Sequence, residues 1–335
     1  MINLSARRRL GTTPLSLGPL GLGVAPLGNL YAQVSESDAL ETLRVAHQHG
    51  IGWFDVAPYY GFGLAEERLG RFLRETASAS APIVSTKVGR LLEPAAVAPD
   101  HEHFVAPLSY RPVFDYTRAG VERSYADSLR RLGLERVQVL LLHDIDRLHH
   151  VGSHRALIRQ LLDETLPALN QMKAHGRLDA IGLGICEWDV GFEILANADI
   201  DCVLLAGRYT LLDHSAYSSG FLDACARRRV SVLAAGVLNS GFLAGGSSYD
   251  YRQADEFLLR RRQELATICD RYHVVLPAVA LQFAAAHPAV ISAVIGARSP
   301  QEVGEMLEWH RAEIPAGVWL ELREKKFIPE EAPTP

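Results

Sequence analysis

Four side chains that can take part in proton transfer stand at or just after the ends of three short apolar runs. Asp55 and Tyr60 lie in Phe-Asp-Val-Ala-Pro-Tyr-Tyr-Gly, Lys87 in Val-Ser-Thr-Lys-Val-Gly, and His143 in Leu-Leu-Leu-His-Asp. The apolar runs are typical of buried strands, and Tyr60 follows the first of them by five residues. In a parallel barrel, polar residues at the strand ends line the active site. We therefore predict that these four residues meet there as catalytic residues.

An Asp, a Tyr, a Lys and a His held together suit the interconversion of an alcohol and a carbonyl. A free phenol has a pKa of about 10, which is too high for a base near neutrality. We expect the ammonium group of Lys87 to lower the pKa of Tyr60, and Asp55 to hold Lys87 charged and in place. A donor from His143 can orient a substrate oxygen, while a separate cofactor carries the hydride.

Each of the four residues also has an ordinary structural interpretation. A Tyr after a strand often only packs, a Lys at a strand end is often solvated, and a lone His is usually structural. Asp55 and Lys87 also match a plain ion pair. The catalytic interpretation is favoured because all four fall on or just after three consecutive predicted strands, at the same end.

Composition excludes several other classes of protein. The 335 residues are 48% hydrophobic and 22% charged, which is ordinary for a globular chain with a sizeable core. A net charge of −5 and no basic block argue against a nucleic-acid partner. The apolar runs are too short to span a bilayer, and no signal peptide is recognisable. Four cysteines without CxxC spacing favour a reducing cytoplasm, with Cys186 as a buried thiol.

Apolar runs alternate with helical patterns along most of the chain. We predict strands at 20–22, 53–55, 83–86, 137–142, 180–183, 203–205, 230–234 and 290–295. We predict helices at 35–49, 64–76, 115–132, 154–174, 190–196, 215–226, 254–271 and 300–309. Eight such units predict an α/β fold, a (β/α)₈ barrel, in a single domain over 1–335. Turn chemistry at 10–15 predicts an N-terminal hairpin cap, and 329–335 reads as a disordered tail.

Two of the predicted strand-to-helix loops are long enough to bind a ligand. Residues 89–114 contain Phe104, Tyr110, His101 and His103, and residues 239–253 are rich in Gly, Ser and Tyr. Long loops at the catalytic end of a barrel usually carry binding residues. We expect the first loop to fold over the barrel mouth.

The motifs resemble those of the aldo-keto reductase family. The matching segments are Gly52-Trp-Phe-Asp-Val-Ala-Pro-Tyr-Tyr-Gly61, Ala65-Glu-Glu-Arg-Leu-Gly70, Ser85-Thr-Lys87 and Leu142-His143. The resemblance implies an Asp–Tyr–Lys–His tetrad on a (β/α)₈ barrel and a nicotinamide cofactor bound without a Rossmann domain. Tyr60, and not Tyr59, has the family's spacing from Asp55.

The same resemblance implies a set of residues that contact the cofactor. They are Gly23, Val24, Asp55, Gly184, Arg208, Asn239, Ser240, Gly241, Leu243, Gly296, Arg298 and Glu302. The chain departs from the family where Ile181-Gly-Leu-Gly-Ile-Cys-Glu-Trp188 lacks a common Ser-Asn and where Arg208 precedes Tyr209 in place of a common Gln. In NADP-binding members a Lys-Ser pair and an Arg grip the 2′-phosphate. Gly296-Ala297 and Glu302 stand there in this chain, so we expect NAD, with NADP less favoured and Arg298 as the one nearby cation.

One branch of the family shares further segments with this chain. Residues 25–31, 143–146 and 208–212 resemble the bacterial L-fucose (D-threo-aldose) 1-dehydrogenases and the pyridoxal 4-dehydrogenases, with plant L-galactose dehydrogenases as more distant relatives. The resemblance implies NAD-dependent oxidation of the anomeric carbon of an aldose, a sugar hemiacetal, to the lactone. Pyridoxal oxidation to 4-pyridoxolactone and general aldehyde or ketone reduction are the alternatives.

Three other classes fit the sequence less well. Some barrels of this family are regulatory subunits of membrane channels, but the intact tetrad argues against that role. A Schiff-base aldolase using Lys87 gains no support from the Asp55–Tyr60 spacing. A metal site at His101, His103, His149 and His150 lacks any zinc spacing, so we expect no metal. No GxGxxG or Walker loop follows the first strands. We expect a monomer or a small homo-oligomer.

Overall fold

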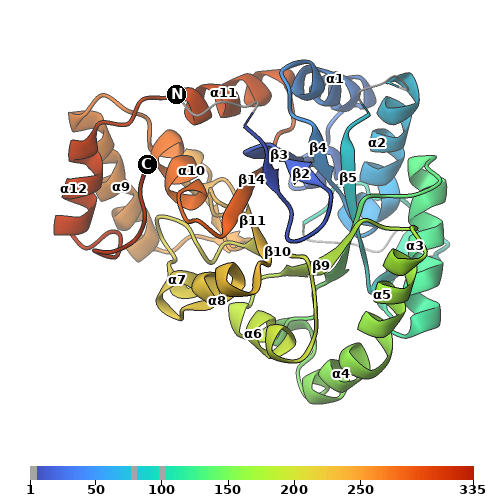
Figure 1. The fold of residues 1–335 in the computed structure, drawn as a ribbon. Coiled ribbons are helices and arrows are strands. Elements are labelled where there is room, and N and C mark those ends of the chain that lie inside the picture. The colour runs from blue at the N-terminus through green and yellow to red at the C-terminus, as the bar shows by residue number, and fades with distance from the viewer. Residues whose placement is uncertain (1–5, 77–80, 98–102) are drawn as a thin grey trace.

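A closed barrel of eight parallel strands forms the centre of the molecule (Figure 1). The computed structural model describes residues 6–76, 81–97 and 103–335. In order around the barrel, the strands are β3 (Leu20–Gly23), β4 (Trp53–Asp55), β5 (Ile83–Val88), β8 (Val139–His143), β9 (Ala180–Ile185), β10 (Cys202–Ala206), β11 (Ser231–Ala235) and β14 (Val290–Gly296). The last strand pairs with the first, so the sheet has no open edge. The predicted (β/α)₈ fold is confirmed.

Helices surround the barrel and cover the outer face of its strands (Figure 1). They are α1 (Glu36–Gln48), α2 (Leu64–Glu75), α3 (Arg118–Leu132), α4 (His154–Gln160), α5 (Leu166–Ala174), α6 (Trp188–Asn197), α7 (Ser215–Ser218), α8 (Phe221–Arg228), α9 (Glu256–Arg271), α10 (Leu276–Ala285), α11 (Pro300–Arg311) and α12 (Ala316–Glu324). Ser35 caps α1, since its hydroxyl accepts from the amide of Asp38. Helix α3 begins later than predicted because Asp115 bonds the amide and hydroxyl of Thr117 instead.

The N-terminal hairpin closes one end of the barrel, as predicted. Strands β1 (Arg8–Arg9) and β2 (Ser16–Leu17) pair antiparallel. The hairpin side chains Leu10 and Leu17 belong to the same apolar cluster as Trp53 and other inward side chains of the strands. The amide of Gly11 also donates to the hydroxyl of Ser231 at 2.7 Å. Ligands therefore enter the barrel from the opposite end, where the strands finish.

Alternation along the strands decides which polar side chains face the barrel axis. On β4, Trp53 lies in the interior cluster while Phe54 lies in the outer core, so Asp55 points inward again. On β5, Val84 and Val88 pack outward, which turns Ser85 and Lys87 inward. The register pairs Asp55 with Ser85, and Lys87 with Leu141. The inward polar side chains of Asp55 and Lys87 thus rest on a filled apolar layer.

Two residues of segment 65–70, one of the segments that resemble the family, hold neighbouring elements together. Glu66 is fully buried, accepts from the hydroxyl of Thr86 at 2.7 Å and pairs with Arg131 at 2.6 Å. Arg68 donates to the carbonyl of Val34 and to Asn29 on the loop after β3. These contacts tie α2 to β5, to α3 and to the rim of the barrel, so the motif is structural here.

Both long loops form small antiparallel hairpins at the barrel mouth. The first contains β6 (Arg90–Pro94) and β7 (Tyr110–Phe114), and the second contains β12 (Ser248–Tyr249) and β13 (Arg252–Gln253). A β-bridge joins Leu30 to Phe104, so the first loop also reaches the loop after β3. His101 lies outside the described residues. Among the helices of the described chain, none is both long and apolar enough to cross a bilayer.

The C-terminal third differs most from the sequence-based prediction. Helix α10, which was not predicted, packs against the barrel, while α9 lies outside it against α12 (Figure 1). The helix predicted over 215–226 is two helices, because Gly220 adopts a φ of 77° between them. The prediction of a disordered tail at 329–335 is wrong. Ala332 is buried, and Arg323 donates to its carbonyl and to Thr334.

Candidate active site

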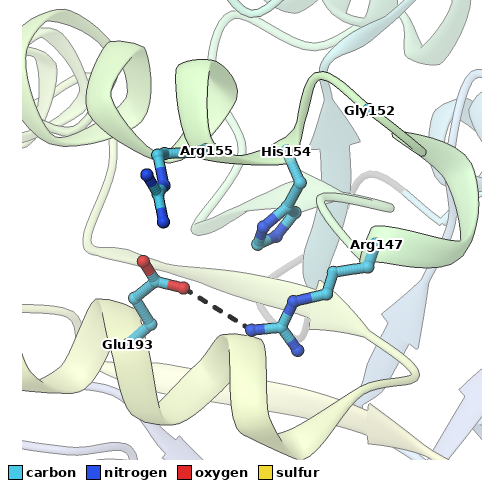
Figure 2. Close-up of a pocket in the computed structure, with 5 residues that line it drawn as sticks. All are labelled: Arg147, Gly152, His154, Arg155 and Glu193. Atoms are coloured by element: carbon cyan, nitrogen blue, oxygen red, sulfur yellow. Dashed lines mark ion pairs between the residues drawn. The ribbon is translucent and has the colours of Figure 1, made fainter.

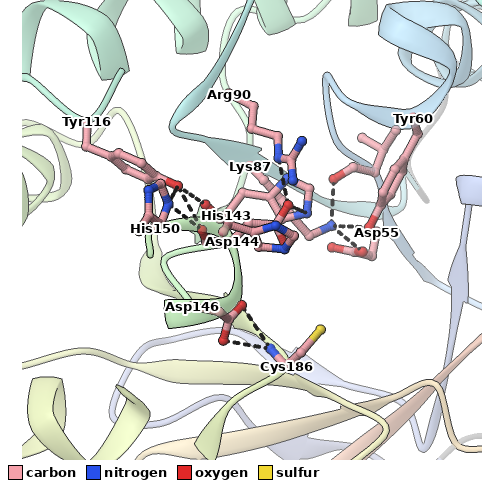
Figure 3. Close-up of polar contacts among 12 residues, drawn as sticks. Asp55, Tyr60, Lys87, Arg90, Tyr116, His143, Asp144, Asp146, His150 and Cys186 are labelled. Carbon is pink, nitrogen blue, oxygen red and sulfur yellow. Dashed lines mark hydrogen bonds and ion pairs between the residues drawn. The ribbon is translucent and has the colours of Figure 1, made fainter. Parts of the chain in front are cut away.

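Lys87 is the centre of a buried polar cluster at the ends of β4 and β5 (Figure 3). Its Nζ atom donates to Asp55 Oδ2 at 2.6 Å, to the carbonyl of Val56 at 3.0 Å and to the hydroxyl of Tyr60 at 3.1 Å. Lys87 is only 1% exposed. All three donor positions of the ammonium group are therefore occupied, which orients the lysine toward Tyr60.

Asp55 is held from both sides of its carboxylate. The hydroxyl of Ser85 donates to Oδ1 at 2.7 Å, while Lys87 binds Oδ2. The indole of Trp53 in turn donates to the Ser85 hydroxyl at 3.3 Å. Beside the lysine, Gly184 leaves room for the stem, since a Cβ there would lie 3.3 Å from Cδ and Cε of Lys87. The ion pair is thus fixed by packing as well as by charge.

The two adjacent tyrosines occupy different environments. Tyr60 receives the hydrogen bond from Lys87, and its ring lies edge-on to His143 with centroids 6.0 Å apart. Tyr59 packs against Phe104, and the guanidinium of Arg90 lies over its ring at 3.9 Å. The structure therefore brings together the four predicted residues with Tyr60, rather than Tyr59, beside the lysine.

The electrostatic environment of Tyr60 differs from the one expected. Burial and the negative charges of Asp55 and Asp144 raise its pKa well above the ordinary value, and Arg90 only partly opposes them. The prediction that Lys87 lowers this pKa is not supported, because the carboxylate of Asp55 lies 2.6 Å from Lys87 Nζ and offsets its effect on Tyr60. Tyr60 is therefore a neutral phenol near pH 7, which is the state of a proton donor.

His143 is a neutral imidazole within the same cluster. Burial lowers its pKa to about 3, and the charges of Lys87 and Arg90 act in the same direction against the opposing effect of Asp144. A neutral imidazole carries one N–H, so it can donate one hydrogen bond to a substrate oxygen. His143 is thus suited to orient a hydroxyl or carbonyl group without itself transferring a proton.

Sequence reasoning missed an ion pair that borders the tetrad. Asp144 follows His143, and its Oδ2 atom lies 2.7 Å from Arg90 Nε at the start of β6. Burial opposes ionisation of Asp144, but His143, Arg90 and His149 outweigh it and lower its pKa. The signal available in the sequence was a carboxylate directly after the strand-end histidine.

The second long loop, 239–253, contacts the first long loop across the barrel mouth, and the first long loop in turn contacts the loop after β3. The ring of Tyr251 lies 5.7 Å from His103, and His103 lies 6.2 Å from Tyr31. The Tyr251 amide donates to the Ser240 hydroxyl at 3.0 Å. Aromatic side chains from three loops therefore line the rim above the tetrad.

The predicted cofactor residues lie on three parts of the barrel mouth. Gly23 pairs with Asp55 in the sheet register, and the Val24 amide donates to the Asp55 carbonyl at 2.8 Å, so both adjoin the tetrad. Arg208, after β10, pairs with Asp250 of the second hairpin at 2.7 Å. That ion pair links the loop after β10 to the loop after β11.

The segment from Asn239 to Leu243 has polar groups that suit a phosphate-bearing ligand. Asn239, Ser240 and Gly241 all have positive φ angles of 48°, 59° and 83°. The side-chain amide of Asn239 is buried and bonds no described atom. Within the described chain, the backbone amides of Ser240 and Gly241 also donate to no acceptor. Leu243 is buried beneath them. The segment therefore fits the pyrophosphate of a dinucleotide.

The third part lies after β14, where Gly296 ends the strand. Arg298 and Glu302 bond each other through the Arg298 amide at 2.7 Å and through its guanidinium at 2.7 and 3.0 Å. Glu302 stands in the first turn of α11, where Ser299 caps the helix. The carboxylate thus already has a cationic partner.

The one group of described residues with metal-ligand geometry is Asp144, Asp146 and His149, whose ligand atoms lie within 4.8 Å of one another. Its charges already have protein partners, since Arg90 pairs with Asp144 and the amides of Cys186 and Glu187 donate to Asp146. Burial and the charge of Asp144 raise the pKa of Asp146 to about 7. The cluster gives no reason to assign a metal.

A separate cavity of about 400 Å³ lies between the start of α4 and α6 (Figure 2). It is lined by Arg147, Gly152, His154, Arg155 and Glu193, none of which belongs to the tetrad or to the cofactor set. Arg147 pairs there with Asp189 and Glu193. Because these carboxylates offset its charge, the cavity is not a strong anion site.

The fold and the cluster define a class of enzyme: a barrel oxidoreductase with its acid–base group at the strand ends. The chain belongs to the aldo/keto reductase family, whose sequence model matches residues 19–326. Members of this family bind a nicotinamide cofactor, and the chain is an oxidoreductase acting on alcohol and carbonyl groups. The resemblance seen in the sequence is confirmed.

Two relatives match almost the whole chain. A pyridoxal 4-dehydrogenase of Microbacterium luteolum is 41% identical, with 98% of this chain and 99% of the relative covered. A D-threo-aldose 1-dehydrogenase of Pseudomonas sp is 38% identical, with 94% and 96% covered. Among solved structures, an aldo-keto reductase from Bacillus halodurans in its holo form has a TM-score of 0.75 at 22% identity over 95% of both chains, which supports the fold.

Proposed function

We propose that the chain is an NAD-dependent dehydrogenase that oxidises the anomeric carbon of an aldose, such as L-fucose, to the lactone. The observation that carries the proposal is the contact of Lys87 with both Asp55 and Tyr60, at 2.6 and 3.1 Å, in a buried site. The similarity to a D-threo-aldose 1-dehydrogenase supports the choice of substrate class.

In the oxidative direction, the C–H bond at the anomeric carbon breaks and its O–H proton passes to Tyr60. A bound nicotinamide would accept the hydride. His143 donates a hydrogen bond to the reacting oxygen, and Asp55 holds Lys87 directed at Tyr60. Lactone formation requires Tyr60 as the phenolate, whereas the reverse reaction uses the phenol directly.

Pyridoxal is the second candidate substrate. The similarity to a pyridoxal 4-dehydrogenase favours it, and so do the aromatic side chains around the mouth, Tyr59, Phe104 and Tyr251. The pair of Arg90 and Asp144 beside the tetrad favours a substrate with several hydroxyl groups, because charged groups form directional hydrogen bonds with hydroxyls. General carbonyl reduction is the remaining alternative.

NAD is proposed over NADP because of the carboxylate of Glu302. This carboxylate would repel a 2′-phosphate and could accept hydrogen bonds from ribose hydroxyls, and it pairs with Arg298. We further propose a small-molecule substrate, a cytoplasmic location, and a monomer or small homo-oligomer without a nucleic-acid or membrane partner. The net charge of −5 and the absence of a basic block support this proposal.

A substrate panel tests the proposed function. Purified protein is assayed with L-fucose, D-arabinose, L-galactose and pyridoxal, each with NAD⁺ and NADP⁺, by the absorbance of the reduced cofactor. We expect the highest kcat/KM for an aldose with NAD⁺, and lactone as the product by mass spectrometry. A kcat/KM for pyridoxal far above that of every aldose would replace the first candidate by the second.

A further inference from the structure

Asp144 has an unusual backbone conformation that three hydrogen bonds maintain. Its φ is 52°, in the left-handed region that non-glycine residues seldom adopt. The Asp144 amide donates to the Gly184 carbonyl at 3.0 Å, and the Asp144 carbonyl accepts from Tyr116 at 3.0 Å and from His150 at 2.9 Å. A strained residue so firmly held next to reacting groups indicates a function for its side chain.

This conformation turns the Asp144 carboxylate toward His143 (Figure 3). Oδ2 of Asp144 lies 3.6 Å from Nε2 of His143 and 2.7 Å from Nε of Arg90. The guanidinium of Arg90 is itself sandwiched between aromatic rings, 3.9 Å from Tyr59 and 4.5 Å from Phe114. Arg90 therefore fixes the carboxylate beside one particular nitrogen of the imidazole.

The neutral ring of His143 has two tautomers, and its surroundings distinguish them. Nδ1 is buried and has no hydrogen-bond partner among the described atoms. A proton on Nδ1 would be a buried, unpaired donor, and the Nε2 lone pair would then face the Asp144 carboxylate. With the proton on Nε2, the N–H lies on the side of the Asp144 carboxylate. The buried Nδ1 atom is then a hydrogen-bond acceptor without a partner among the described atoms, and not an unpaired donor.

We propose that Asp144, anchored by Arg90, is a positioning residue that holds His143 in the Nε2–H tautomer. In this tautomer Nε2 is the only imidazole atom that can donate to a substrate oxygen, so Asp144 determines whether His143 can orient the substrate. The role in turnover rests on the proposed function, but the tautomer is a property of the protein without substrate.

The tautomer is measured by ¹⁵N NMR of the histidine-labelled, full-length protein. The chain has 13 histidines, and His143→Gln identifies the His143 signals by their loss. We expect Nε2–H in the wild type. Asp144→Gly tolerates the positive φ and removes the carboxylate, so its population of Nδ1–H should rise. Asp144→Asn, which also adopts this conformation readily, should shift in the same direction by less.

Activity gives a second readout on the same variants. Asp144→Gly should lower kcat about tenfold or more, with the KM for cofactor within about threefold of wild type. Asp163→Asn, an exposed carboxylate away from the site, is the control and should change neither the tautomer nor kcat. If Asp144→Gly does not fold, Asp144→Asn and Arg90→Gln, each checked by circular dichroism, provide the test.

Two results would overturn the inference: Nδ1–H in the wild type, or an unchanged tautomer in every folded variant of Asp144 and Arg90. A shifted tautomer in a protein that oxidises no aldose would refute the proposed function and leave the positioning role standing. Aldose oxidation by the wild type, together with an unchanged tautomer in the variants, would support the proposed function and refute the positioning role.

Discussion

At the ends of β4, β5 and β8 the polar side chains bond one another inside the barrel, whereas at the ends of β10, β11 and β14 they pair across loops. Asp55 and Lys87 are 3% and 1% exposed. The side chains of Arg208 and Asp250 are 24% and 33% exposed, and Arg298 is 52% exposed. Charge pairs of similar length therefore have different solvent access in the two halves of the mouth.

The difference separates a fixed half, for which we propose catalysis, from an adjustable half, for which we propose cofactor binding. Buried pairs on strands are screened little and cannot rearrange without cost, which suits groups that must keep one geometry. Pairs on loops can exchange partners with water or with a ligand phosphate. Substitutions in the first half should therefore change kcat and stability, and those in the second half should change cofactor affinity.

The largest effect is expected for Tyr60→Phe. Removal of the hydroxyl that contacts Lys87 should lower kcat by roughly 10²–10⁴, because a positioned acid–base group contributes about that much. Cofactor binding, measured by fluorescence titration, should stay near the wild-type value. Tyr59→Phe is the matched control and should retain most activity. The reverse pattern would show that Tyr59 is the proton carrier.

The next effect concerns stability in the catalytic half. Asp55→Asn leaves the Lys87 ammonium buried without its carboxylate, and breaking a buried pair in this way costs about 3–5 kcal/mol. We expect the free energy of unfolding in urea to fall by that order. Asp199→Asn, at the exposed pair with Arg228, should leave it unchanged. Equal effects of the two substitutions would contradict the contrast between the halves.

A smaller effect is expected in the dependence of rate on pH. Since burial and nearby carboxylates raise the pKa of Tyr60, the phenol predominates at neutral pH and the phenolate increases as pH rises. The oxidative kcat should therefore rise with pH, by about tenfold per unit below the pKa, while the reductive kcat should not. Initial rates in both directions across neutral and alkaline pH measure this. An oxidative rate that is flat over that range would exclude the neutral phenol.

The smallest effect is expected in the cofactor half. Glu302→Arg removes the partner of Arg298 and adds a second cation, so the ratio of kcat/KM for NADP⁺ to that for NAD⁺ should rise by about tenfold. The kcat of this variant with NAD⁺ should stay close to the wild-type value, because Glu302 does not contact the tetrad. Glu305→Gln on the same helix is the control. A wild-type preference for NADP⁺ would contradict the assignment of NAD.

The sequence was sufficient to predict the strands and the tetrad for one physical reason. Strand-end positions are encoded locally, since a short apolar run ending in a polar residue predicts both the strand and the side chain at its mouth. Helix α10 was missed because eight of its ten residues are buried, which leaves no amphipathic period to detect. Helix α9 has that period, with three buried residues of sixteen, and was therefore predicted as the helix between β11 and β14.

The electrostatics of the site could not be predicted from spacing. The partner of Asp144 is Arg90, 54 residues earlier in the chain, and only the hairpin after β5 brings them together. The raised pKa of Tyr60 depends on burial and on the two carboxylates of Asp55 and Asp144, which no single motif contains. The disordered tail was predicted from composition, and tertiary contacts of Arg323 override that tendency.

The register of the β6–β7 hairpin has a consequence for how the enzyme can diversify. Arg90 stands opposite Phe114 in that register, and the pairing continues to Pro94 opposite Tyr110. These five residue pairs fix the base of the hairpin, whatever the length of the segment at its tip. They thereby also hold the guanidinium of Arg90 between the rings of Tyr59 and Phe114. The segment between Pro94 and Tyr110 can therefore vary to recruit other substrates as long as Phe104, which packs against Tyr59 and Tyr60, stays in place.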